Sequence, residues 1–212
     1  GHAVEAGRAT DGFSTESFIA AMHLNSLKRA GAVVDALDLA RVDRVLDIGG
    51  GSGGYAIAFC RAKADLKAAV FDRPSVTPLT RRYAEEAGVG DRIEMVDGDY
   101  NTDGLPTGFN LVLLSAILHS NSPAENLALL RKCRAAVLPG GQIVIQDYLM
   151  DETRTEPPSG AMFALNMLVN TAAGDSYTER ERRGWLGDAG FEETRRIDPP
   201  GNPNGLLVAR KR

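Results

Sequence analysis

The sequence is poor in the residues that mark disulfide frameworks, metal clusters and membrane spans. It has only two cysteines, Cys60 and Cys133, and no C-x-x-C pair. Each stands in an apolar, helix-like stretch, which is typical of a reduced core residue. No apolar run is long enough to span a bilayer, and the segment from Gly1 to Gly12 is polar, without the apolar core of a signal peptide. These absences predict a cytoplasmic protein with no membrane segment.

An excess of either charge is also missing. The 24 basic and 28 acidic side chains give a net charge of −4 with no long run of one sign, so nucleic acid and anionic membranes are not expected partners. A small-molecule partner is favoured. Histidine occurs three times, and His2 next to Gly1 looks like a tag remnant, which leaves His23 and His119. No cluster of acids and histidines has ligand-like spacing, so we expect no metal.

The order of strand-like and helix-like segments predicts an α/β fold. From Arg44 onward the two kinds alternate, as in a Rossmann-like, doubly wound and mostly parallel sheet with helices on both faces. The last two strand-like segments, 191–196 and 206–210, are expected to form an antiparallel edge at the C-terminal end. We expect 1–14 to be a tag remnant and flexible lead-in and 15–212 to be one domain.

Several segments allow finer expectations about single elements. The stretch 15–39 has apolar residues at helical spacing and predicts one or two helices, with Gly31 as a break. The nearly unbroken apolar run 110–118 predicts a central strand that ends at His119.

A glycine-rich turn follows the first predicted strand. In Leu46-Asp47-Ile48-Gly49-Gly50-Gly51-Ser52-Gly53-Gly54 the glycines allow a tight turn and a close approach of the backbone to a ligand before a helix begins. Gly49, Gly51 and Gly54 also satisfy G-x-G-x-x-G, and Asp72 lies 18 residues beyond Gly54. A dinucleotide site therefore stays open on this motif alone.

Acidic residues around the turn favour a cationic ligand. Asp47 stands two residues before the first glycine, where a carboxylate can hold an ammonium group or ordered water but would repel a pyrophosphate. Asp72 ends the second strand and can accept both hydrogen bonds of a ribose diol. Asp99 ends the third strand, where it could meet an adenine amino group. The alternative for each acid is a solvated residue at a strand end.

Together these motifs resemble the class I S-adenosylmethionine-dependent methyltransferases, and more closely their small-molecule O-methyltransferases, which include plant phenolic and bacterial antibiotic or pigment enzymes. The resemblance covers nearly the whole chain from Phe18. It is carried by Val45 to Gly53, Val70-Phe71-Asp72-Arg73-Pro74, Gly98-Asp99-Tyr100, Ile117-Leu118-His119, Leu138-Pro139-Gly140-Gly141 and Thr178 to Phe191.

The resemblance implies that 15–212 is a methyltransferase catalytic domain that binds S-adenosyl-L-methionine and releases S-adenosyl-L-homocysteine. Asp72 would bind the ribose, the turn the methionine moiety, and Asp99 with Tyr100 the adenine. The expected cofactor residues are Asp47, Gly49, Gly51, Gly53, Asp72, Asp99, Tyr100 and Ser115.

His119 matches the general base of this family, and Asp147, 28 residues further on, matches the acid that orients the base. Two departures leave catalysis open. Ser120-Asn121 stands where the family has Asp-Trp, and a second orienting acid before Thr178 is replaced by the shifted Asp175. A cofactor-binding scaffold without methyl transfer therefore stays an alternative, followed by an NAD-dependent oxidoreductase, although no Tyr-x-x-x-Lys constellation is present.

The expected acceptor is a hydroxylated aromatic or polyketide-like small molecule of secondary metabolism. Its pocket would be lined by Phe18, Met22, Asn25, Asn166 and Asn170, whereas Phe163 is better explained as helix core. Relatives carry a helical N-terminal region used for dimerisation, which this chain lacks. The resemblance thus implies a homodimer of a longer protein.

Overall fold

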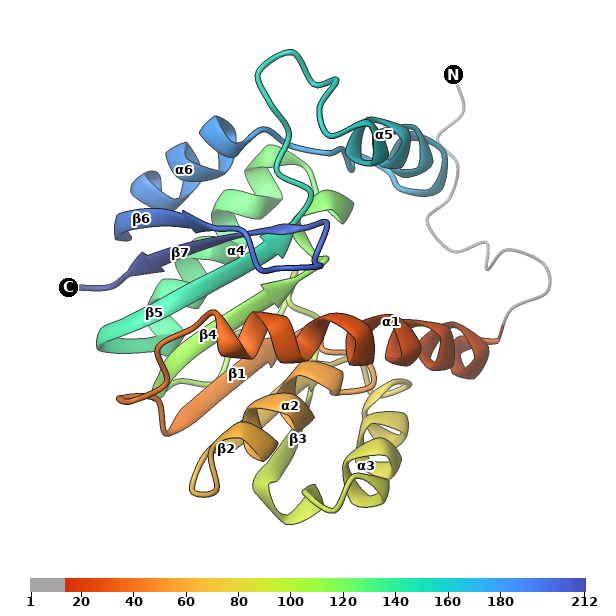
Figure 1. Ribbon diagram of the computed structural model, residues 1–212, viewed down its shortest axis with the longest axis vertical. Helices are drawn as coiled ribbons and strands as arrows, with labels where there is room; N and C mark the ends of the chain where they lie inside the picture. Colours follow the sequence, from red (N-terminus) through yellow and green to blue (C-terminus); the bar gives the residue numbers. More distant parts are fainter. Residues whose placement is uncertain (1–13) are drawn as a thin grey trace.

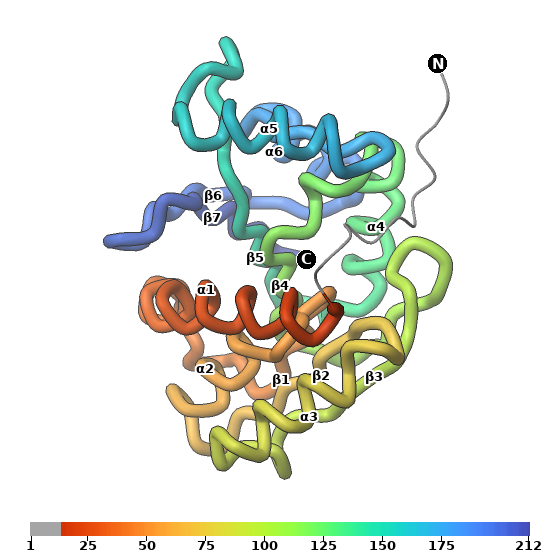
Figure 2. Tube along the Cα trace, turned by 90° about the vertical axis from the view of Figure 1, so that its right-hand side faces the viewer, coloured from red at the N-terminus to blue at the C-terminus, as the bar shows by residue number. Residues whose placement is uncertain are grey.

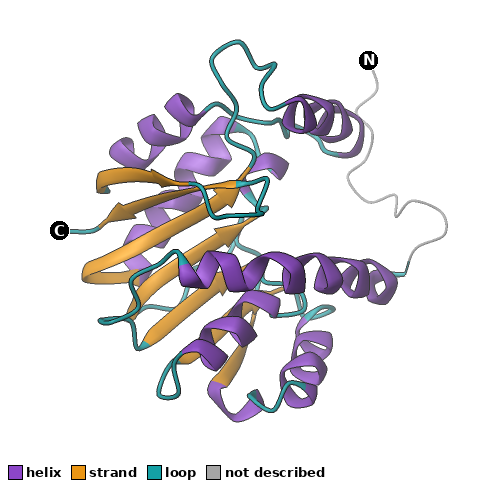
Figure 3. Ribbon diagram, viewed as in Figure 1, coloured by secondary structure: helices purple, strands orange, loops and turns teal. Residues whose placement is uncertain are grey.

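The computed structural model describes residues 14–212, which form a central sheet flanked by helices (Figure 1 and Figure 3). The expected lead-in, apart from Ser14, lies outside the described residues. The elements, in chain order, are α1 Thr15–Asp35, β1 Arg44–Ile48, α2 Gly54–Ala62, β2 Lys67–Asp72, α3 Thr77–Glu86, η1 Gly90–Arg92, β3 Ile93–Asp97, β4 Phe109–Ser115, η2 Leu118–Ser120, α4 Pro123–Ala136, β5 Val137–Asp147, α5 Pro158–Asn170, α6 Glu179–Asp188, β6 Glu192–Ile197 and β7 Gly205–Arg210.

The sheet has the order β3-β2-β1-β4-β5-β7-β6. Strands β1 to β5 run parallel, while β7 pairs antiparallel with both β5 and β6. This arrangement confirms the predicted α/β fold with an antiparallel C-terminal edge. The strand order reverses between β1 and β4, and ligands of open α/β sheets bind at the carboxyl ends of the strands beside such a reversal.

Each strand feeds two hydrophobic cores, because successive side chains point to opposite faces. In β1, Val45 packs in the core beneath α1 and α2, whereas Leu46 packs in the core beneath α4 and α6. The same alternation repeats at Leu111 and Val112 of β4. Burial on both faces explains the continuous apolar runs in these strands.

Helix α1 is continuous, so the expected break at Gly31 is wrong. Val33 and Val34 are buried among residues of α2, while Gly31 itself is exposed. Glycine in a helix interior costs about 1 kcal/mol relative to alanine, and packing against α2 outweighs this cost. The Ser14 side chain caps the helix by accepting a hydrogen bond from Ser17 N.

Strand β4 ends earlier than the apolar run predicts. It stops at Ser115, and Ala116 has a left-handed backbone with φ +57°. The chain then turns into η2, which contains His119. Ile117 and Leu118 are buried in the core beneath α4 rather than in the sheet. The apolar run therefore indicates which residues are buried, and the strand itself is shorter than the run.

Two helices flank the carboxyl ends of the central strands. Figure 2 shows α1 and α5 on opposite sides of the ends of β4 and β5.

Within residues 14–212, no helix combines the length and apolar character required to cross a membrane.

Candidate cofactor and active site

The glycine turn after β1 requires glycine at several positions. Gly49, Gly51 and Gly53 have φ of +64°, +58° and +74°, which side-chain-bearing residues rarely adopt. A Cβ on Gly49 would also collide with Ile117. The turn therefore lies directly against the segment that leads from β4 to His119.

Asp72 is held at the rim of this turn. Its Oδ2 accepts a hydrogen bond from Gly51 N and its Oδ1 one from Arg73 N, both at 2.8 Å. A carboxylate offers about four acceptor positions, so each oxygen keeps one for a ligand. The side chain is half-buried. This geometry fits a ribose diol.

Asp47 lies beneath the turn, where it is fully buried. A Cβ on Gly50 would lie 2.7 Å from its Oδ2, and neither carboxylate oxygen has a hydrogen-bond partner among the described residues. Burial, with a smaller contribution from the charge of Asp72, raises the pKa of Asp47 to about 7. The turn thus covers a carboxyl group that lacks a counter-charge.

The two expected adenine residues differ in position. Tyr100 is half-buried, and its Cε1 would lie 3.8 Å from a Cβ on Gly49, so the structure brings it to the turn. Asp99 is exposed, and its Oδ1 accepts a hydrogen bond from Asn101 N within its own loop. Ser115, at the end of β4, donates to Gln146 Oε1 at 2.9 Å.

The structure brings His119 and Asp147 together. Nδ1 of His119 lies 3.1 and 3.2 Å from the two carboxylate oxygens of Asp147, which ends β5. Both side chains are buried. Facing an ionised carboxylate, Nδ1 must carry the proton and donate it, which leaves Nε2 as an acceptor. The pair therefore has the arrangement of an oriented general base.

A third residue, Arg182 of α6, completes this pair. It is fully buried, its Nη2 lies 3.4 Å from Asp147 Oδ2, and its Nη1 donates to Tyr148 O at 2.5 Å. Burial alone would raise the pKa of Asp147, but the charge of Arg182 and the contact with His119 outweigh it and lower that pKa. Nothing in the local sequence distinguishes Arg182 from the other arginines of α6, so sequence analysis missed it.

The shifted carboxylate of Asp175 does not reach the histidine ring. It forms an ion pair with Arg154 at 2.5 Å, while Asp175 N donates to His119 O at 3.0 Å. A Cβ on Gly174 would collide with the same carbonyl. This segment thus fixes the backbone of His119 and supplies no second acid.

Helix α5 contributes an aromatic side chain to the site. The ring of Phe163 packs edge-on against His119 with centroids 4.8 Å apart, so Phe163 lies beside the dyad. Asn166 and Asn170 are exposed and joined to each other by a 2.6 Å hydrogen bond. On α1, the expected acceptor residues Phe18, Met22 and Asn25 are also exposed.

His23 of α1 is a further contact that sequence analysis left without a role. Its Nδ1 lies 2.9 Å from Ser52 Oγ in the glycine turn, and its ring stacks on Tyr83 at 4.0 Å. From α3, Thr80 donates to Gly51 O at 2.5 Å. Helices α1 and α3 therefore both brace the turn.

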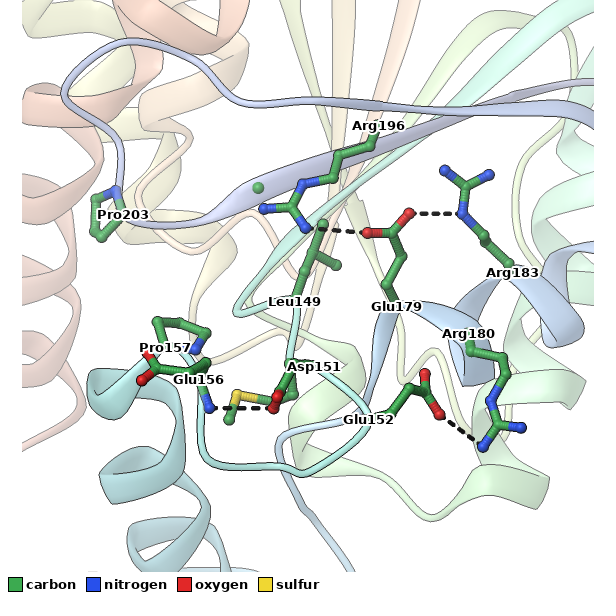
Figure 4. Close-up of a pocket in the computed structure, with 12 residues that line it drawn as sticks. Leu149, Asp151, Glu152, Glu156, Pro157, Glu179, Arg180, Arg183, Arg196 and Pro203 are labelled. Atoms are coloured by element: carbon green, nitrogen blue, oxygen red, sulfur yellow. Dashed lines mark hydrogen bonds and ion pairs between the residues drawn. The ribbon is translucent and has the colours of Figure 1, made fainter.

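A cavity lies apart from these residues. It measures about 700 Å³ and is bounded by the loop after β5, the start of α6 and the β6–β7 connection (Figure 4). Its arginines are paired with glutamates: Arg183 and Arg196 bind Glu179, and Arg180 binds Glu152. None of the predicted site residues lines it. Within residues 14–212, no group of three His, Cys, Asp or Glu side chains has a metal-binding arrangement.

The fold and the site define a Rossmann-like domain with a glycine turn, an acid at the rim of that turn and a histidine–aspartate dyad. A family model described as an O-methyltransferase domain matches residues 2–192, and the chain belongs to this family. It is 36% identical over 203 residues to 3-hydroxy-5-methyl-1-naphthoate 3-O-methyltransferase of Streptomyces sahachiroi, covering 95% of this chain and 58% of that relative.

Two further relatives widen the comparison. The chain is 34% identical over 183 residues to L-tyrosine C(3)-methyltransferase of Streptomyces lavendulae, covering 84% of this chain and 50% of that protein. The structure resembles human N-acetylserotonin methyltransferase solved with S-adenosylmethionine, with a TM-score of 0.83, 27% identity, and coverage of 93% of this chain and 55% of the human one. The chain thus spans between half and three fifths of these relatives.

Proposed function

We propose that the protein transfers a methyl group from S-adenosyl-L-methionine to a hydroxyl group of an aromatic or polyketide-like small molecule, with His119 as general base. The observation that carries the proposal is the buried His119–Asp147 pair just beyond a glycine turn. Ile117, two residues before His119, contacts that turn at Gly49, so a methyl donor on the turn would face the histidine.

Two glycines of the turn and two acids beside it support the binding of a methyl donor. Asp72 would accept the two ribose hydroxyls through its remaining lone pairs. Gly49 and Gly51 would let the backbone approach the methionine moiety. The buried Asp47, which has no counter-charge in the described structure, would be stabilised by a ligand cation. The proposed product is S-adenosyl-L-homocysteine.

His119 would act on the acceptor. When bound, S-adenosylmethionine supplies a sulfonium methyl group that is already activated for transfer. Nε2 of His119 would take the acceptor hydroxyl proton as the new O–C bond forms and the S–C bond breaks. The ionised Asp147 would hold the productive tautomer and stabilise the imidazolium that results. Such base catalysis contributes roughly 100- to 10,000-fold.

The test is methyl transfer from labelled cofactor to a panel of hydroxyaromatic compounds, with His119→Gln beside the parent. We expect the variant to bind the cofactor with nearly unchanged affinity in calorimetry and to lose transfer by roughly 100-fold or more. His23→Gln is the matched histidine control, because His23 contacts Ser52 and Tyr83 and not the His119–Asp147 pair. Cofactor binding without transfer in the parent would instead support a scaffold role.

The position of the new methyl group needs its own measurement. One relative is named a C-methyltransferase and another an O-methyltransferase. A base that deprotonates a phenol activates its oxygen and also its ring carbons. Carbon-13 NMR of the product, with the label in the donated methyl, separates the two: a methoxy signal supports the proposal and an aryl-methyl signal contradicts it.

We also propose that the full-length protein is a cytoplasmic homodimer. The described chain exposes large apolar side chains on both helices that flank the site, namely Phe18, Met22, Leu24 and Leu27 on α1 and Met162, Leu165, Leu168 and Val169 on α5. Such patches mark interaction surfaces. Both cysteines are buried and unpaired, as suits a reducing compartment. Sedimentation of the full-length protein as a monomer would contradict the dimer.

A further inference from the structure

Arg182 is the largest fully buried charged side chain of the described structure, and folding has brought it to the catalytic dyad. Its Nε and Nη2 have no hydrogen-bond partner there, and Nη1 is spent on Tyr148 O. A buried guanidinium with so few partners is costly, and an apolar residue at such a place is often as stable or more so. Stability alone therefore does not explain it.

The backbone around Arg182 is tied directly to the end of β5. Glu179 N donates to Met150 O and Met150 N donates to Tyr177 O. Thr178 caps α6 through a capping box with Glu181. These bonds fix the first turn of α6 beside Asp147, so the guanidinium reaches Oδ2, an oxygen that also faces Nδ1 of His119.

The charges of this cluster balance before proton transfer. Asp147 carries −1 and Arg182 carries +1, since arginine stays protonated in proteins, while His119 is neutral. The other ionisable groups that face the pair are Glu181 and Tyr177, both next to Arg182. Asp175 does not contact the His119 ring, and its carboxylate forms an ion pair with Arg154. When His119 takes a proton, the resulting imidazolium faces the Asp147 carboxylate, whose charge is already partly neutralised by Arg182.

We propose that Arg182 is a positioning residue for the dyad: its guanidinium keeps Asp147 ionised and limits how strongly the pair retains the proton received by His119. The inference rests on the proposed role of His119 as base. Without Arg182, the Asp147 carboxylate would interact with the imidazolium of His119 alone and stabilise it more strongly, or Asp147 would itself become protonated. Either outcome protonates the dyad at higher pH and removes the base near neutrality.

The experiment measures the pH profile of kcat for Arg182→Met and Arg182→Gln. We expect the acid limb to move to higher pH by about one unit or more, with kcat reduced at pH 7 and recovered at pH 9, and KM for S-adenosylmethionine within about twofold of the parent. Arg182→Lys keeps the charge and should keep the limb near its original position. Arg183→Gln, which removes a charge from the same helix but binds Glu179, is the matched control.

Three results would overturn the inference. The first is a neutral variant that is active with an unmoved acid limb, and the second is a uniform loss of kcat at every pH, as a merely structural role predicts. The third, which needs no folded neutral variant, is a shifted limb in Arg182→Lys. If His119→Gln retains full transfer, the proposed role of His119 as general base is rejected. That result is distinct from the three above, which reject the role of Arg182 alone.

Discussion

Two buried aspartates, Asp47 in β1 just before the glycine turn and Asp147 at the end of β5, have opposite shifts of their pKa. Asp47 is fully buried without a donor, and burial raises its pKa to about 7. Asp147 is 2% exposed, yet Arg182 and His119 outweigh burial and lower its pKa. The contrast separates a buried carboxyl group without a counter-charge from one whose cationic partners belong to the protein itself.

The largest effect is expected for Asp147→Asn. The change removes the negative charge that holds the proton on Nδ1 of His119, replaces one carboxylate oxygen by an NH2 donor and leaves the Arg182 charge unpaired. We expect kcat to fall by roughly 100- to 10,000-fold and the free energy of unfolding by about 3 to 5 kcal/mol, read from single-turnover assays and urea denaturation. Asp175→Asn, the nearby acid that does not touch the ring, should leave kcat within about twofold.

Asp47→Asn should produce opposite effects on affinity and stability. Losing the charged partner should weaken S-adenosylmethionine binding by roughly 10- to 100-fold. Because native Asp47 holds its proton up to about pH 7 while the unfolded carboxyl ionises near 3.8, the cofactor-free protein loses stability as pH rises between these values. At pH 8 the asparagine variant should therefore be more stable, by up to about 4 kcal/mol.

Calorimetry of cofactor binding and thermal denaturation at pH 5 and pH 8 measure the two effects of Asp47→Asn. Asp65→Asn is the control, because that side chain is exposed and lies before β2, at the amino end of the strand, away from the glycine turn. A variant with parental affinity and no gain in stability at pH 8 would mean that Asp47 is satisfied without the ligand.

A smaller effect is expected on the acceptor side from Phe163→Ala. The Phe163 ring packs edge-on against His119, and such aromatic contacts contribute about 0.5 to 1.5 kcal/mol. We expect kcat to fall roughly 2- to 10-fold with cofactor affinity unchanged. Leu168→Ala, an exposed change on the same helix, is the control; equal losses in both variants would argue for a general effect on α5.

The smallest effect is expected for Gly31→Ala. Gly31 lies in the interior of α1, and nothing lies within 4 Å of an added Cβ. The unfolding free energy should rise by about 0.5 to 1 kcal/mol without a change in activity. Gly88→Ala is a sharp contrast, since that position is equally open but has φ +72° and should lose stability. Thermal denaturation compares the two.

Sequence reasoning was strongest where structure is local. The glycine turn and the parallel sheet follow from residues close together in the chain, and the structure confirms both features. The resemblance to the O-methyltransferases also implied the pairing of His119 with Asp147, and the structure brings these two side chains together.

The features that sequence reasoning missed depend on packing between distant segments. Arg182 reaches Asp147 only because α6 is tied to the end of β5. His23 reaches Ser52 only because α1 lies across the turn. The predicted helix break at Gly31 is wrong for the same reason, since packing against α2 outweighs the low helix propensity of glycine. The prediction that the central strand ends at His119 is wrong, because the buried apolar run continues beyond the end of β4 into a turn and η2.

Carbon-13 NMR of labelled aspartate carboxyls, titrated with and without S-adenosylmethionine, tests the contrast between the two aspartates most directly. Asp47→Asn and Asp147→Asn assign the two signals. We predict that Asp47 titrates near pH 7 in the cofactor-free protein and at a lower pH once the cofactor binds, while Asp147 stays ionised from pH 8 to pH 5. An Asp47 signal that titrates near pH 4 in the cofactor-free protein, and is unchanged by the cofactor, would contradict the account.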